Sequence, residues 1–207
     1  MENQEDFIRD ITEIRSMMER TTKFLSLSGW AGIMAGVFAL AGACIAYKVF
    51  GFNPEEVAYP ESGTGYPPEL LYTWLLGIAV LILSISTAIY FSGRKATKRK
   101  EKLWNPTSRR LLVNMGLPLV TGGVLILILI SKGLAGFVMP MSLIFYGFSL
   151  YIAGKHTYED VKTLGLIQIV LGLLGCYFVN YALLFWALGF GAAHIFYGAY
   201  IYFKYEK

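Results

Sequence analysis

The chain has 207 residues, of which 56% are hydrophobic and only 15% are charged. Its mean hydropathy is +0.53 and its formal net charge is +4. A soluble domain keeps about a quarter of its residues charged, so these values exclude an ordinary water-soluble globular fold and favour an integral membrane protein.

The first 25 residues predict a cytoplasmic amphipathic helix, separate from the membrane domain expected over 26–207. The residues on one face of this helix recur at alternating intervals of four and three positions, which is the heptad spacing. Its positions are Phe7, Ile11, Ile14, Met18, Thr21 and Leu25. Three roles stay open for it: self-association or packing under the bundle, binding in the headgroup plane, or binding a soluble partner. Its mixed charges favour the first, which would make the protein a homo-oligomer. With no cleavable leader evident, we expect the first spanning helix to be retained.

Six apolar stretches follow, each about long enough to cross a hydrocarbon core of roughly 30 Å. They cover approximately 26–50, 70–91, 111–131, 134–153, 158–179 and 182–203. Their sequences do not alternate between apolar and polar residues, as barrel strands would, and a helix pairs its own backbone groups in lipid. We therefore predict an all-α polytopic protein with six transmembrane helices.

Two loops carry helix-start signals. Asn53-Pro54 is followed by two glutamates and predicts a short outer helix, and Asn105-Pro106 predicts the start of the third span. In both, Asn is a preferred N-cap residue, and Pro suits the first helical position because its missing N–H would have no partner there.

The positive charges predict the orientation. Of the 18 Lys and Arg, all but Lys48 and Lys132 fall on one side of the six spans. Because the cytoplasmic side carries the excess of positive residues, both termini are expected on the cytoplasmic side of a bacterial inner membrane. The basic run 94–110 is interpreted as an anchor that attracts anionic lipid, and binding of nucleic acid is not expected.

Short motifs recur along the membrane domain. The sequence Ile-Phe-Tyr-Gly occurs at 144–147 and again at 195–198, and Ser86 and Tyr90 occupy comparable positions in the second span. The odd-numbered spans each hold two glycines seven residues apart: Gly29 and Gly36, Gly116 and Gly123, and Gly165 and Gly172. Small residues let helices approach closely in lipid. We predict three tandem helical hairpins, although glycine is common enough in such helices for chance spacing to remain an alternative.

Two polar residues stand near the middle of the last two spans. Gln168 lies 12 residues before the turn at Asn180 and His194 lies 14 after it, so their depths differ by about 3 Å. Aligning the repeats places Leu119 and Leu143 at the corresponding positions, so the scaffold itself does not require polar groups there. Buried polar groups in a membrane need partners and are often functional.

A polar layer at this depth could form a binding site or a pore, with Thr121 and Ser142 as further members. Pro118 and Pro140 could kink spans three and four nearby and free backbone carbonyls. The alternative is that His194 and Gln168 only hydrogen-bond to lock one hairpin.

We predict no cofactor, because the second histidine, His156, falls in a loop and cannot complete a bis-histidine haem site, and because no cluster of metal ligands is evident. Nor does the chain offer the residues of an intramembrane enzyme. Two functions remain: a non-enzymatic membrane component with a regulatory or scaffolding role, or a small channel or transporter that uses the polar layer.

The run EIRSMMERTTKFLSLSGWAGIMAG, over 13–36, resembles the start of a family of uncharacterised bacterial six-helix inner-membrane proteins. The resemblance covers mainly the N-terminal segment and the first span, and it implies no activity.

Overall fold

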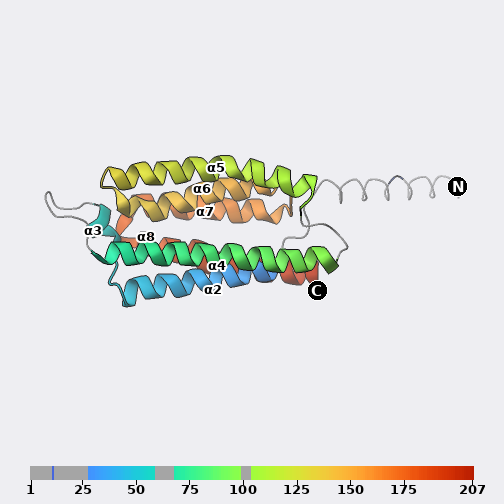
Figure 1. Cartoon of the computed structure of the whole chain (residues 1–207), viewed down its shortest axis with the longest axis horizontal. Helices are drawn as coiled ribbons and strands as arrows, with labels where there is room; N and C mark the ends of the chain where they lie inside the picture. The colour runs from blue at the N-terminus through green and yellow to red at the C-terminus, as the bar shows by residue number, and fades with distance from the viewer. Residues whose placement is uncertain (1–10, 12–27, 59–67, 99–103) are drawn as a thin grey trace.

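The computed structural model describes residue 11 and residues 28–58, 68–98 and 104–207 (Figure 1). These residues are mainly helical, and no strand occurs among them. The predicted helix over 1–25 lies outside the described residues apart from Ile11, which is helical and exposed.

Six helices are long and apolar enough to span a membrane, as the sequence predicted. The first five spans contain α2 (Gly29–Lys48), α4 (Pro68–Lys98), α5 (Pro106–Ser131), α6 (Val138–Ala153) and α7 (Asp160–Tyr177). The 3₁₀ turn η1 (Ala135–Phe137) leads directly into α6. The short helix α3 (Pro54–Ala58) lies at the end of the bundle opposite the C-terminus (Figure 1).

The sixth span is continuous but not uniform. It passes through the 3₁₀ turn η2 (Val179–Tyr181), α8 (Ala182–Trp186), the π-helix η3 (Ala187–Ala193), α9 (His194–Ile201) and the π-helical turn η4 (Tyr202–Glu206). A π-helix is wider than an α-helix and is often found at functional positions. The wide turns here come just before His194, in a segment with two glycines.

The predicted helix starts are confirmed at both Asn-Pro sites. The Asn53 side chain accepts from the Glu55 N–H at 3.1 Å. The Asn105 side chain accepts from the Ser108 N–H at 2.8 Å, while the Ser108 hydroxyl accepts from the Asn105 N–H at 2.9 Å. The second pair is a reciprocal capping box, which satisfies two N–H groups that the helix itself leaves unpaired.

Glycines bring α6 and α7 into backbone contact. A methyl group on Gly165 would lie 2.7 Å from the carbonyl oxygen of Gly147, and one on Gly147 would lie 2.6 Å from the carbonyl oxygen of Gly165. Two turns further along α7, a methyl group on Gly172 would lie 2.5 Å from Cγ1 of Ile144. Because no larger residue fits, the glycines fix the separation of these two helices.

The same contact recurs between α2 and α9. A methyl group on Gly198 would lie 2.5 Å from the carbonyl oxygen of Gly29, and one on Gly36 would lie 2.6 Å from Cγ1 of Ile195. Residues of both Ile-Phe-Tyr-Gly motifs therefore meet a glycine pair of an odd-numbered span.

Among the described residues, the helices of the bundle pack in an open series, with no close packing between α4 and α5. Close contacts join α4 to α2, α2 to α9, α7 to α6 and α6 to α5. In contrast, α4 and α5 are mostly open: 6% and 11% of their apolar stretches are buried, compared with 44% for the fourth span. Their outward faces are apolar, as expected for surfaces in contact with lipid. These two helices form the two ends of the series of packed helices.

Candidate buried polar cluster

The structure brings His194 and Gln168 together. His194 Nδ1 lies 2.9 Å from the carbonyl oxygen of Gly189, and Gln168 Nε2 donates to the same oxygen at 2.8 Å. The two side chains are 3.3 Å apart at their nearest nitrogens. Gln168 is 0% exposed and His194 6% exposed, so both sit inside the bundle rather than on its lipid-facing side.

Tyr146 completes the cluster from α6, with its hydroxyl 3.1 Å from His194 Nε2. A hydroxyl can donate to Nε2 only if that nitrogen carries no proton, which leaves the proton on Nδ1 for the bond to Gly189. The Tyr146 ring is also stacked on the imidazole, with centroids 5.5 Å apart. Both imidazole nitrogens therefore have a hydrogen-bond partner within the bundle.

Glycine at position 189 makes this geometry possible. A methyl group there would lie 2.5 Å from Gln168 Oε1 and 2.5 Å from Cδ2 of Leu143. The residue belongs to the π-helix η3, whose last residue directly precedes His194. Close approach of the Gln168 amide to the helix backbone therefore depends on the missing side chain.

One polar atom of the cluster is left over. Gln168 Oε1 is buried and has no hydrogen-bond partner among the described residues. An unpaired carbonyl oxygen in a buried site is costly, because it has given up its bonds to water without replacement.

The other predicted members lie apart from this cluster. Thr121 is exposed on α5 and its hydroxyl donates to the carbonyl oxygen of Leu117, while half-buried Ser142 donates to that of Met139. Both bonds stay within one helix, the usual way for a hydroxyl to be satisfied in lipid. Among the described hydrogen bonds, neither side chain reaches His194 or Gln168.

The two prolines differ in position. Pro118 lies inside α5, which continues through it. Pro140 lies in the first turn of α6, after η1, and is buried. At the start of a helix the missing proline N–H removes no internal bond, so Pro140 accompanies a helix start rather than an interruption of the fourth span.

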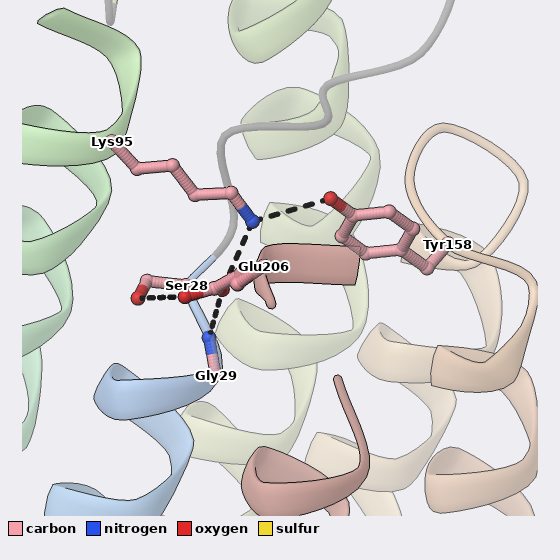
Figure 2. A network of polar contacts seen from close by, with 5 residues as sticks. All are labelled: Ser28, Gly29, Lys95, Tyr158 and Glu206. Atoms are coloured by element: carbon pink, nitrogen blue, oxygen red, sulfur yellow. Dashed lines mark hydrogen bonds and ion pairs between the residues drawn. The ribbon is translucent and has the colours of Figure 1, made fainter. Parts of the chain in front are cut away.

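A second polar network, which the sequence did not reveal, joins four segments at the end of the bundle that holds the C-terminus. Lys95 of α4 and Glu206 of η4 form an ion pair at 3.0 Å with side chains 11% and 12% exposed (Figure 2). Lys95 also bonds the Tyr158 hydroxyl at 3.2 Å, just before α7 (Figure 2). The Glu206 carboxylate reaches the N–H of Gly29, where α2 begins.

Sequence reasoning identified Lys95 only as one of many positive charges and gave Glu206 no role. Their sequence separation is large, and neither lies in a motif that indicates a partner. Nearby, Asp160 at the start of α7 binds Lys204 Nζ at 2.9 Å and the Tyr205 hydroxyl at 2.9 Å. These polar contacts tie the end of the sixth span to α4, α2 and α7.

Comparison of the chain with protein-family models, with curated proteins and with solved structures finds no match.

Proposed function

We propose that the protein is a non-enzymatic component of the bacterial cytoplasmic membrane with a scaffolding or regulatory role, built from three helical hairpins in tandem. The main support is the way its buried polar groups are used. Tyr146 bonds His194, and His194 and Gln168 share the Gly189 carbonyl as acceptor. Groups that satisfy each other inside the bundle hold helices together, and catalysis or transport would need them to face a substrate.

The hairpin repeat is supported by equivalent contacts at equivalent positions. A methyl group on Gly165 would meet the backbone of Gly147 and Tyr151, and one on Gly29 would meet that of Gly198 and Tyr202. Both pairs join the odd-numbered span of one hairpin to the even-numbered span of another. Hairpins related in this way share one orientation, which implies a pseudo-symmetry axis along the membrane normal.

The surfaces that we propose contact lipid headgroups and partner proteins are those expected on the cytoplasmic side. Among the described residues, Arg94, Lys98, Arg109 and Arg110 are exposed and flank the junction of α4 and α5. We assign this basic junction to anionic lipid headgroups, which attract Lys and Arg near the membrane surface. The helix proposed over residues 1–25 would add a surface for a partner or for a second copy.

Orientation can be tested with a chain in which Cys44 and Cys176 are replaced by Ala. Glu55 and Lys155 are both exposed and lie at opposite ends of the bundle. A membrane-impermeant maleimide should label Glu55→Cys in intact spheroplasts, and Lys155→Cys only after permeabilisation. The reverse pattern would overturn the cytoplasmic assignment.

A small channel or transporter is the second candidate, favoured by two observations on the sixth span. The span widens into a π-helix beside His194, and Gln168 Oε1 is a buried acceptor without a partner. Such a site would take a small hydrogen-bond donor, so water, ammonia and a protonated amine are suitable probes.

The two functions separate in one experiment. The wild-type protein and a His194→Leu/Gln168→Leu variant are reconstituted in liposomes, and the flux of each probe is compared with that of empty liposomes. The proposed scaffold predicts that both proteins match the empty liposomes. A flux that the wild type supports and the double variant lacks would contradict it and establish the channel or transporter.

A further inference from the structure

The third glycine pair, on α5, differs from the other two, because no described residue packs against it. On α7 and α2 the corresponding glycines are buried against another span. On α5, a methyl group on Gly116 or Gly123 would meet no described atom within 4 Å. Val120 lies between them and is 66% exposed. We call Gly116, Val120 and Gly123 the α5 notch.

A matching surface is open on α4. Aligning the second span with the fourth places Ala79, Leu83, Ser86 and Tyr90 at the positions of Pro140, Ile144, Gly147 and Tyr151. Pro140, Ile144 and Gly147 are buried against the α7 glycines, but all four α4 residues are exposed. We call these four residues the α4 ridge. The α4 ridge differs from the two filled contacts at one position, because Ser86 stands where they have Gly147 and Gly198, so a contact between ridge and notch is wider than those two.

We propose that the α5 notch receives the α4 ridge of a second copy of this chain, and that the second copy's notch receives the ridge of the first. The inference rests on the hairpin repeat of the proposed function, and it is independent of whether the His194 cluster conducts. In a dimer with one two-fold axis along the membrane normal, each notch is covered by the ridge of the other chain. No notch or ridge then stays open to bind a third chain, so the assembly stops at two copies.

The chain's own α4 is held away from this position. In its middle, Val80 packs closely on Gly42 of α2, with Cγ2 2.8 Å from where a methyl group on Gly42 would be. At its cytoplasmic end, Ala96 is 1% exposed and Lys95 is paired with Glu206. Moving α4 across to α5 would break these contacts, whereas a second copy offers the same ridge with no rearrangement.

The α5 notch is also held in place, by contacts between α5 and α6. A methyl group on Gly122 would lie within 2.5 Å of the Phe145 ring of α6, and Ser149 Oγ donates to the Met115 carbonyl at 3.0 Å. These contacts set the rotation of α5 so that the notch faces outward. In lipid, close packing of small residues drives association, and a preformed notch and ridge lose little freedom when they meet.

Disulfide trapping tests the pairing directly. In the filled contact, a methyl group on Gly147 lies 2.7 Å from Cγ1 of Ile169, and Ser86 and Val120 occupy these positions in the open one. Ser86 would hold the helices farther apart than glycine does, which relieves this overlap and leaves the two positions facing each other, as a disulfide with Cβ atoms about 3.8 Å apart needs. Ser86→Cys and Val120→Cys are placed on two differently tagged chains without Cys44 and Cys176, co-expressed, and oxidised in native membranes.

We expect a disulfide-linked dimer that carries both tags. Leu81→Cys replaces Ser86→Cys as the matched control: it is also exposed on α4, but five residues turn a helix by about 140°, so it faces away from the ridge. Adding Gly123→Ile should lower the dimer yield at least about tenfold, while Gly77→Ile, at an open position off the ridge, should not.

Two results would overturn the inference. A cross-link that forms only when both cysteines are in one chain would show that the chain closes on itself. Equal or absent cross-linking for the ridge and control positions would show that lipid or a different protein covers the notch. A dimer that forms normally while the flux experiment reveals a channel would uphold the interface and remove only the scaffold function.

Discussion

The Glu206 carboxylate accepts a 2.6 Å hydrogen bond from the N–H of Gly29, so the end of the sixth span caps the start of the first (Figure 2). Ser28, at the N-cap position of α2, makes no capping bond with its own side chain, and its hydroxyl lies 3.4 Å from the same carboxylate. A negative charge at a helix N-terminus is favourable because the unpaired N–H groups point toward it. Lys95 neutralises this charge, which joins three spans in one polar contact.

Glu206→Ala should destabilise the protein markedly, because it leaves the nearly buried Lys95 ammonium without its carboxylate and the first turn of α2 without its cap. Breaking a buried ion pair from one side costs about 3–5 kcal/mol. Thermal unfolding in detergent micelles provides the measurement. Glu159→Ala is the matched control: its ion pair with Lys162 is 76% exposed on the glutamate side, and the expected loss is under about 1 kcal/mol. Equal losses for the two variants would contradict the proposed role of the network.

Gly165→Ala and Gly116→Ala are the same substitution at positions of α7 and α5 that correspond in the proposed repeat, with different expectations for monomer stability. The methyl group at 165 would overlap the Gly147 carbonyl, whereas the one at 116 meets no described atom within 4 Å. Overpacking costs about 1–3 kcal/mol, so Gly165→Ala should lower the free energy of unfolding by that amount. Gly116→Ala should leave it unchanged in dilute detergent. Both values come from unfolding in a denaturing detergent, and a similar loss for both variants would mean that the α5 notch is filled within the chain.

Tyr146→Phe and His194→Leu should be coupled. Each single change leaves one partner of the 3.1 Å hydroxyl–imidazole bond without the other, while the double variant removes both polar groups and leaves two apolar side chains. The double variant should therefore lose less stability than the sum of the singles. Side-chain hydrogen bonds in membranes have coupling energies of about 0.6–1.7 kcal/mol. A thermodynamic cycle of the four proteins gives this energy, and strict additivity would show that the bond contributes nothing.

The sequence identified features that depend on local pattern or on lipid. Six spans follow from apolar length, since hydrocarbon tolerates neither charges nor unpaired amides. The helix starts at Asn53-Pro54 and Asn105-Pro106 follow from capping chemistry within four residues. Depth along two adjacent helices was also enough to bring His194 near Gln168. Their partners were not predictable, because Tyr146 is one of 14 tyrosines and the Gly189 carbonyl has no side-chain signature.

The amino-acid sequence by itself determined that this chain forms helices long and apolar enough to cross a bilayer, because that outcome depends on composition and on spacing along a single segment. Only the tertiary structure decided which of the glycine pairs contact a neighbouring helix. Two of three near-identical pairs are buried and the third is open, since contact with a neighbour depends on where α2 and α6 hold α4 and α5. The capping of α2 by Glu206 was decided in the same way, because helix packing alone brings residues 29 and 206 together.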